Sequence, residues 1–185
     1  MSAPGEVAKG GGGPTAIILA GGLGTRLRES VSDRPKVLAE VCGRPYLAFL
    51  LDQMVDAGVR SIVLCTGYMG ELVEEAFGAS YRGARLDYSL EPEPLGTGGA
   101  LALALERGLV ATTPTIVLNG DSYCDVDVRA YLAWAAETGA RSALVLKEVD
   151  DASRYGRVEV GDGDALVSFR EKEEGSGAGW INAGI

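Results

Sequence analysis

Short, continuously apolar runs alternate along the chain with longer segments whose apolar residues recur every three or four positions, and few folds accommodate this pattern. Thr15–Leu19, Ser61–Thr66 and Thr115–Asn119 are runs of the first kind. An uninterrupted apolar strand is buried on both faces, as in a parallel sheet covered by crossover helices. Between the first two runs, apolar residues from Leu47 to Val55 recur at helical spacing. The pattern therefore predicts a three-layer α/β fold with a mostly parallel sheet.

The same signals, together with turn residues, predict further strands and helices. One helix opens at Pro45 and ends at Gly58. Residues 157–160 and 166–169 flank Gly161-Asp162-Gly163, a hairpin signal that makes the expected sheet mixed. The remaining predicted elements are a short helix near Glu71–Phe77, a strand at Leu86–Leu90, helices at Gly99–Gly108 and Val128–Thr138, and a strand at Ser142–Glu148.

The domain organisation follows from length and composition. Residues 1–14 are glycine-rich and lack hydrophobic periodicity, so we expect a flexible tail there. Residues 15–185 contain no internal repeat and have a length that suits one domain, at about 100–200 residues per domain. The chain stops at Gly184-Ile185 in what reads as the start of another strand, so we expect the domain to lack its C-terminal part.

The composition excludes several kinds of chemistry and partner. Histidine is absent, so Ser-His-Asp catalysis and histidine-ligated zinc cannot be built within this chain. Cys42, Cys65 and Cys124 are widely spaced in apolar stretches, which predicts buried reduced thiols and a cytoplasmic location. The net charge of −9 argues against binding to nucleic acid or anionic lipid. The apolar runs are far shorter than the roughly 18 residues of a membrane helix.

A glycine-rich, cationic loop follows the first apolar run. Gly21, Gly22 and Gly24 leave backbone N–H groups accessible to phosphate oxygens, and Arg26 and Lys36 are among the four cations that outnumber two carboxylates between positions 26 and 36. This combination in an acidic chain predicts a polyphosphate site. The dinucleotide fingerprint G-x-G-x-x-G fails because Leu27 occupies its last position, and no Gly-Lys pair of a Walker A loop occurs.

These residues resemble the signature of the sugar-1-phosphate nucleotidyltransferases, and the resemblance spans nearly everything from Thr15 onward. The matching motifs are Gly21-Gly22-Leu23-Gly24-Thr25-Arg26-Leu27 with Pro35-Lys36, Glu91-Pro92-Glu93-Pro94-Leu95-Gly96-Thr97-Gly98-Gly99, Asn119-Gly120-Asp121, Arg154-Tyr155-Gly156, Glu171-Lys172 and Asn182-Ala183-Gly184. Among subfamilies, the chain is most similar to D-glycero-D-manno-heptose-1-phosphate guanylyltransferases, with mannose-1-phosphate guanylyltransferases close behind. The resemblance implies a Rossmann-like nucleotidyltransferase fold.

The family reaction is attack by a sugar-1-phosphate oxygen on the α-phosphate of a nucleoside triphosphate, with release of pyrophosphate. The attacking group is already an anion, which agrees with a chain that lacks histidine. Arg26, Lys36 and Asp121 are the implied catalytic residues, and Asp121 is the implied ligand of Mg²⁺. Asp125 and Asp127 more simply cap the helix predicted from Val128.

The resemblance also implies two sets of binding residues. The nucleotide-binding set is Leu19, Ala20, Gly21, Gly22, Gly24, Thr25, Arg26, Glu91, Leu95, Gly96 and Thr97. The sugar-phosphate-binding set is Asn119, Gly120, Gly156, Glu171, Lys172 and Asn182.

Glu91 bears on the base, because thymidylyltransferases of the family tend to carry glutamine there. A carboxylate only accepts hydrogen bonds, and guanine offers N1–H and N2–H₂ as adjacent donors, so GTP is the favoured nucleotide. The alternative is that backbone groups around Leu95 and Gly96 read the base.

Other functions stay open at this point. The nearest alternatives are a mannose-1-phosphate guanylyltransferase or another sugar-1-phosphate nucleotidyltransferase. A non-catalytic regulatory subunit that binds nucleotide sugars is an alternative from another class, and a dinucleotide-dependent oxidoreductase is a third. The exposed faces of such sheets often pair, so a homo-oligomer is compatible with the sequence.

Overall fold

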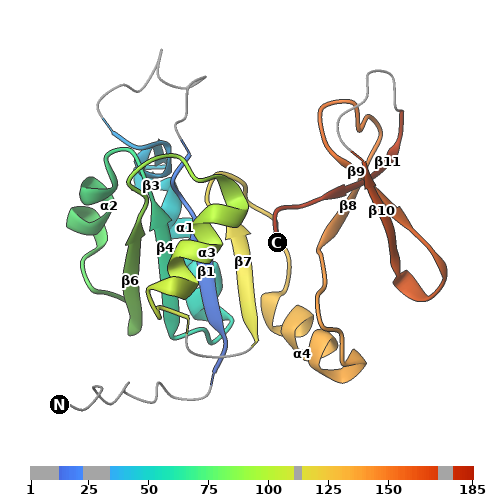
Figure 1. The fold of residues 1–185 in the computed structure, drawn as a ribbon, viewed down its shortest axis with the longest axis horizontal. Helices are drawn as coiled ribbons and strands as arrows, with labels where there is room; N and C mark the ends of the chain where they lie inside the picture. The colour runs from blue at the N-terminus through green and yellow to red at the C-terminus, as the bar shows by residue number, and fades with distance from the viewer. Residues whose placement is uncertain (1–12, 23–33, 111–113, 171–176) are drawn as a thin grey trace. The chain divides into compact units, whose positions relative to one another are not determined.

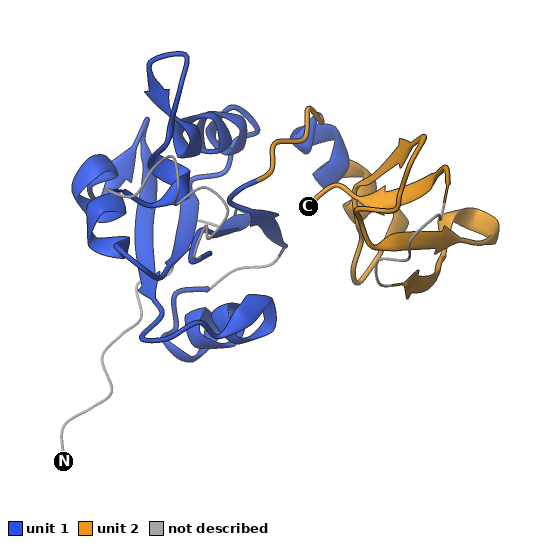
Figure 2. Cartoon of the chain, turned by 90° about the horizontal axis from the view of Figure 1, so that it is seen from above, with its two compact units in different colours: residues 1–121, 127–132 blue, residues 122–126, 133–185 orange. Residues whose placement is uncertain are grey.

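A computed structural model describes residues 13–22, 34–110, 114–170 and 177–185. It divides the chain into two compact units, Met1–Asp121 with Asp127–Leu132 and Ser122–Val126 with Ala133–Ile185 (Figure 2). The single domain predicted for residues 15–185 stays a prediction. Most of the predicted tail, residues 1–12, lies outside the described residues.

The first unit is built on a five-stranded sheet in the order β5-β6-β4-β1-β7 (Figure 1). Its strands are β1 (Thr15–Leu19), β4 (Ser61–Thr66), β5 (Ser80–Tyr81), β6 (Ala84–Leu90) and β7 (Thr115–Asn119). β6, β4, β1 and β7 run parallel, and the short β5 is antiparallel to β6. Leu19 pairs with Cys65 on one side and with Asn119 on the other, so these strands end together. The predicted α/β fold with a mostly parallel sheet is confirmed.

Helices cover both faces of this sheet (Figure 1). α3 (Gly96–Glu106) places Ala100 and Ala104 against Ile17, Val63 and Cys65. α1 (Tyr46–Asp56) lies over the opposite face, and its apolar stripe, predicted from spacing, is buried: Leu47, Leu50, Leu51, Met54 and Val55. α2 (Gly70–Phe77) is a short helix between β4 and β5.

α1 ends where glycine was expected to end it. The N–H of Gly58 donates to the carbonyl of Val55 at 3.0 Å, and that of Val59 to the carbonyl of Met54 at 3.0 Å. This pair of bonds is a Schellman cap, which needs a left-handed residue, and Gly58 has φ of +95°. α3 begins three residues earlier than predicted because the motif glycines Gly96 to Gly98 already belong to its first turn.

A small hairpin connects the first loop to α1. It consists of the 3₁₀ turn η1 (Lys36–Leu38), β2 (Glu40–Val41) and β3 (Arg44–Pro45). Cys42 sits in its turn with φ of +51° and is exposed, so the predicted burial of this thiol is wrong: its apolar neighbour Val41 is itself exposed. Cys65 is buried as predicted, and Cys124 is half-buried.

The second unit contains a four-stranded antiparallel sheet. Its strands are β8 (Leu146–Val149), β9 (Arg157–Val160), β10 (Leu166–Arg170) and β11 (Gly179–Asn182), in the order β10-β9-β11-β8. The β9–β10 hairpin is confirmed, with the 3₁₀ turn η2 (Asp162–Asp164) in its loop. The expectation that this hairpin joins the parallel sheet is wrong, because its strands pair with each other and with β11. The antiparallel edge of the first sheet is β5 instead.

α4 (Val128–Thr138) has the predicted bounds. The Oδ1 atom of Asp127 accepts a hydrogen bond from the N–H of Ala130 at 2.9 Å, so Asp127 caps this helix as expected. β8 also departs from its predicted span, since it begins at Leu146 rather than at Ser142. None of the helices in the described ranges is long and apolar enough to cross a membrane.

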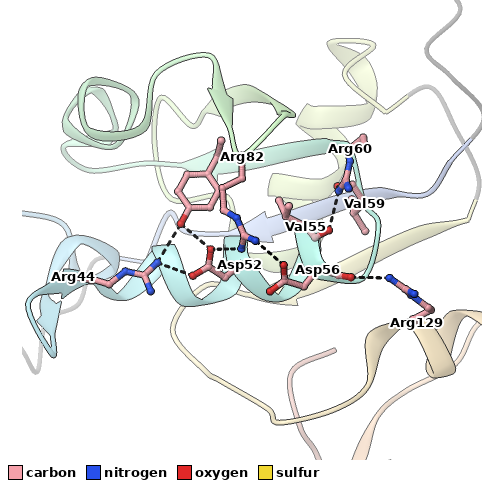
Figure 3. Close-up of polar contacts among 9 residues, drawn as sticks. Arg44, Asp52, Val55, Asp56, Val59, Arg60, Arg82 and Arg129 are labelled. Atoms are coloured by element: carbon pink, nitrogen blue, oxygen red, sulfur yellow. Dashed lines mark hydrogen bonds and ion pairs between the residues drawn. The ribbon is translucent and has the colours of Figure 1, made fainter.

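A polar cluster centred on Asp52 ties three segments of the first unit together (Figure 3). Asp52, on α1, accepts hydrogen bonds from Arg44 of β3 at 2.6 Å, from Arg82 at 2.8 Å and from the hydroxyl of Tyr81 at 2.9 Å. Arg82 and Gly83 both have positive φ in the two-residue turn between β5 and β6. Burial opposes ionisation of Asp52, but the hydrogen bonds from Arg44, Arg82 and Tyr81 outweigh it, so its pKa lies below the ordinary value.

We expect Asp52→Asn to lower the free energy of unfolding by about 1–2 kcal/mol at pH 7, because it leaves these donors without a carboxylate. A depressed folded-state pKa contributes stability above the unfolded pKa of 3.8, and this contribution is lost as pH falls through the folded value. The difference between wild type and variant should therefore be full at pH 7 and shrink below about pH 4. Urea denaturation at several pH values measures it.

Asp56→Asn is the matched control. In this cluster the carboxylate of Asp56 accepts a hydrogen bond from Arg82 at 2.9 Å, and its side chain is 63% exposed. Its loss should be smaller than that of Asp52→Asn. A variant Asp52→Asn as stable as wild type at pH 7 would contradict the role given to this cluster.

Candidate functional site

The candidate site lies where the parallel strands of the first unit end. The N–H of Glu91, after β6, donates to the carbonyl of Thr66 at 2.7 Å, and the N–H of Gly120, after β7, donates to the carbonyl of Leu19 at 2.9 Å. These bonds hold the loops after β1, β4, β6 and β7 side by side. Open α/β sheets bind ligands in the crevice beyond the carboxyl ends of their strands.

A cavity of about 500 Å³ opens at this edge. Its volume falls within the range of roughly 300–1,000 Å³ typical of small-molecule sites. Most predicted site residues of the first unit that the structure describes line it: Leu19, Ala20, Gly21, Gly22, Lys36, Glu91, Gly96, Thr97, Asn119 and Asp121.

Three further residues line the cavity although the sequence predicts no role for them. They are Val37, Pro94 and Ala100. Pro94 lies inside the motif that supplies Glu91 and Gly96, and Val37 and Ala100 adjoin other motif residues, so closeness in the chain is the signal that could have found them. All three give the cavity an apolar lining beside its polar groups.

Several predicted residues are not described. Gly24, Thr25 and Arg26 fall within residues 23–33, and Glu171 and Lys172 fall within residues 171–176; both ranges lie outside the described residues. Their predicted roles stay predictions.

The first turn of α3 borders the cavity. Leu95 is the N-cap residue, and Gly96 and Thr97 of the first turn line the cavity. The first N–H groups of a helix have no partner within it, and the helix dipole adds partial positive charge there. This end of α3 therefore offers a binding place for an anion.

Glu91 is held by the same loop. It is half-buried, and its Oε2 atom accepts a hydrogen bond from the N–H of Leu95 at 3.1 Å. A Cβ atom built on Gly21 would collide with Oε1 of Glu91, so any larger residue at position 21 would displace the carboxylate from this position. The side chain is thus oriented between the start of α3 and the loop after β1.

Gly120, predicted to bind the sugar phosphate, is not among the residues that line the cavity. It is buried, and a Cβ atom there would lie 2.6 Å from the carbonyl oxygen of Leu19 and 3.1 Å from the Cα of Ala20. Both are backbone atoms that cannot yield as a side chain does. Close packing of the ends of β1 and β7 therefore requires glycine at this position.

Cys65 is buried close to this edge of the sheet, because it is the last residue but one of β4. Burial, and to a lesser degree the charge of Glu91, raises the pKa of Cys65 to about 11. The group is a thiol at neutral pH, and only the thiolate is a good nucleophile. The arrangement does not favour cysteine chemistry here.

Lys36 and Asp121 form an ion pair in the cavity. The Nζ atom of Lys36 donates to Oδ2 of Asp121 at 2.9 Å, although the residues are 85 positions apart. Pro35, with φ of −61°, leads into η1 and so positions Lys36, while Asp121 follows β7 directly. The side chains are 39% and 54% exposed, so both are accessible to a ligand.

A second cavity of about 390 Å³ shares Gly21, Glu91 and Pro94 with the first. Its lining adds the exposed Tyr68, as well as Glu71 and Glu93. The sequence predicts no function for this group. Glu91 therefore borders two cavities.

Gly156 and Asn182, predicted to bind the sugar, belong to the second unit. A Cβ atom on Gly156 would lie 2.8 Å from the ring of Phe169 and 3.2 Å from the carbonyl oxygen of Arg170, so a larger residue there would displace this ring. Oδ1 of Asn182 accepts a hydrogen bond from the N–H of Gly184 at 2.9 Å. Both residues have structural partners in their own unit.

Comparison with known proteins agrees with this fold and site. Residues 15–185 match the nucleotidyl transferase family. The chain belongs to this family.

Among its relatives, the D-glycero-alpha-D-manno-heptose 1-phosphate guanylyltransferase of Campylobacter jejuni is 38% identical over 170 residues, which cover 92% of this chain and 73% of that protein. The enzyme of the same name from Aneurinibacillus thermoaerophilus is also 38% identical, over 92% and 72%. The crystal structure of HddC from Yersinia pseudotuberculosis complexed with GMP-PN superposes with a TM-score of 0.73 at 34% identity, covering 91% of this chain and 73% of that one.

We expect Gly120→Ala to destabilise the protein by about 1–3 kcal/mol, because the added methyl group meets backbone atoms of β1. Thermal unfolding measures the loss. Gly98→Ala is the control: its Cβ atom meets nothing within 4 Å, and alanine in a helix is favoured over glycine by about 1 kcal/mol. Gly98→Ala should be at least as stable as wild type. Equal melting temperatures for Gly120→Ala and wild type would contradict the packing argument.

Proposed function

We propose that the protein transfers GMP from GTP to D-glycero-α-D-manno-heptose 1-phosphate, with release of pyrophosphate. The observation that carries the proposal is the 38% identity, over 92% of the chain, to two enzymes of that name. The cavity supports it independently, because a glycine loop, a helix N-terminus and a lysine meet there beside a carboxylate. These groups suit a polyphosphate.

The reaction needs little from the protein in the way of covalent chemistry. An oxygen of the sugar phosphate forms a bond to the α-phosphorus of GTP, and the bond from that phosphorus to the bridging oxygen of pyrophosphate breaks. Pyrophosphate leaves with the electron pair. Because the attacking oxygen is already an anion, no general base is required, and catalysis depends on positioning two anions and on neutralising charge.

In this proposal the residues of the site have separate roles. Lys36 lies between the α-phosphate and the sugar phosphate and reduces their repulsion. The backbone N–H groups of Gly21, Gly22 and the first turn of α3 hold phosphate oxygens, and the predicted role of Arg26 is to stabilise charge on the triphosphate. These assignments remain proposals on residue roles.

Asp121 is the residue proposed to hold a divalent metal, and Mg²⁺ is the proposed ion. Its carboxylate lies in the cavity and is about half exposed, and hard oxygen ligands are what Mg²⁺ prefers. When bound there with the triphosphate, the metal supplies charge neutralisation at the phosphates. The donor set fits, since Mg²⁺ usually takes only one or two carboxylates beside substrate phosphates and water.

Glu91 is proposed to read the guanine. The N–H of Leu95 occupies one lone pair of Oε2, but a carboxylate has about four acceptor positions, so the side chain can still accept from guanine N1–H and N2–H₂. Its bond to Leu95 supports the reading because it orients the carboxylate before the base binds.

The sugar-phosphate set stays a prediction: Asn119, Gly120, Gly156, Glu171, Lys172 and Asn182. The same holds for a cytoplasmic location and for a homo-oligomer. None of these is needed for the nucleotide half of the proposal.

The deciding experiment measures pyrophosphate release for every pair drawn from GTP, ATP, CTP, UTP and dTTP and from the 1-phosphates of heptose, mannose and glucose, with Mg²⁺ or with EDTA. We expect the highest kcat/KM for GTP with the heptose phosphate and none with EDTA. A preference for mannose 1-phosphate would favour the other guanylyltransferase. Absence of turnover with every pair would contradict the proposal and favour a non-catalytic, nucleotide-sugar-binding subunit.

Glu91→Gln should lower the ratio of kcat/KM for GTP over dTTP by about tenfold or more, because the amide turns a donor towards the donors of guanine. Glutamine keeps an oxygen for the N–H of Leu95, so the loop should remain intact. Glu93→Gln removes the same charge from the same loop but does not line the larger cavity, which makes it the control. An unchanged preference in Glu91→Gln, or an equal change in Glu93→Gln, would remove the argument for base reading.

A further inference from the structure

Lys36 and Asp121 form an ion pair, and the proposed function assigns them ligands of opposite charge. Lys36 is proposed to bind phosphate, and Asp121 a divalent cation. In the structure these two side chains bind each other, with Nζ 2.9 Å from Oδ2. The ammonium therefore lies at the carboxylate, where the metal is proposed to bind.

Asp121 is the carboxylate beside Lys36 in the described part of the cavity, and Glu91, Thr97 and Asn119 are the other residues of this lining with side-chain oxygens. Within the ranges that the structure describes, no group of three or more aspartate, glutamate, cysteine or histidine side chains could hold a metal ion. Mg²⁺ needs six oxygen ligands, and a lone carboxylate supplies one or two of them. Asp121 by itself is thus a weak site.

Lys36 weakens this site further. Its positive charge already neutralises Asp121, and a divalent ion that ligated the carboxylate would lie within a few ångströms of Nζ. Like charges at such separations repel, and a cavity lined partly by protein screens them less than bulk water does. The metal and the ammonium therefore compete for one carboxylate.

A bound triphosphate favours metal binding at Asp121 in two ways. It carries several negative charges and attracts Nζ more strongly than a single carboxylate does, and its oxygens supply the ligands that Asp121 lacks. Movement of Lys36 from Asp121 to the phosphates takes the competing ammonium away from the carboxylate at the moment when the other ligands arrive.

We infer that Lys36 is an internal counter-ion that blocks Asp121 to divalent metal until a nucleoside triphosphate binds. The inference rests on the proposed function for the identity of the ligand that moves Lys36. Metal and nucleotide are then coupled through one side chain, and by linkage each raises the affinity for the other. The ligand-free protein should bind divalent metal poorly, and removal of the lysine charge should improve it.

Mn²⁺ alone tests this, because its free concentration is read directly by electron paramagnetic resonance without any turnover. In the absence of nucleotide, Lys36→Met should bind Mn²⁺ about tenfold more tightly than wild type, a coupling of ordinary size. Lys36→Gln, which also lacks the charge, should behave alike and serves as a second variant should the first fold poorly. Lys36→Arg keeps a cation and should stay weak.

Two controls locate the effect. Lys147→Met removes an equal charge from β8 in the second unit and should leave Mn²⁺ binding as in wild type, since its loss changes only the net charge. The double variant Lys36→Met/Asp121→Asn should lose the improved site, which assigns it to Asp121. An affinity of Lys36→Met equal to that of wild type or of Lys147→Met would overturn the inference, as would an improved site that survives Asp121→Asn.

These outcomes are separable from the test of the proposed function. If wild type releases pyrophosphate and Lys36→Met binds Mn²⁺ no better, the function stands and the counter-ion role is wrong. If no substrate pair turns over and Lys36→Met still gains the Asp121 site, the counter-ion role stands and the proposed function is wrong.

Discussion

Parallel pairing of β1 with β4 and β7 is the constraint on which the site depends. Since Leu19 pairs with Cys65 and with Asn119, the strands end at one edge, and the segments that follow them are forced together. The backbone bonds of Glu91 to Thr66 and of Gly120 to Leu19 extend that pairing past the strands. Residues from four distant parts of the chain thereby line one cavity, positioned by a sheet whose central strands are buried on both faces.

The cavity shows how a strongly acidic chain can receive an anion. The net charge of −9 is repulsive at long range, but salt screens such interactions beyond about 8–10 Å. Close to the ligand, the groups that count are Lys36 and the N–H groups at the start of α3, beside which Glu91 and Asp121 are each held by a hydrogen-bond donor. The ion pair with Asp121 holds the ammonium of Lys36 at this edge of the cavity.

Some sequence interpretations change when packing is considered. Gly120 and Gly156 match family motifs, and the resemblance assigns them to the sugar phosphate. In the structure a Cβ atom on the first would meet the backbone of β1, and a Cβ atom on the second would meet the ring of Phe169. Glycine at these positions is thus explained by neighbours far away in the sequence. The position of the Glu91 side chain also depends on a residue far away in the sequence. Its hydrogen-bond partner Leu95 is four residues away, but the carboxylate also lies against Gly21.

The sequence by itself determined the mostly parallel α/β architecture and the bounds of several strands and helices, because hydrophobic periodicity and glycine placement act locally. The motifs that line the cavity were found in the sequence through their resemblance to a known family. It did not determine that the β9–β10 hairpin belongs to a separate sheet, since an antiparallel pair looks the same in sequence whichever sheet it joins. Nor did it reveal the exposed Cys42 or the pairing of Lys36 with Asp121. Those depend on which surfaces meet when the strands come into register, and this is a property of tertiary structure alone.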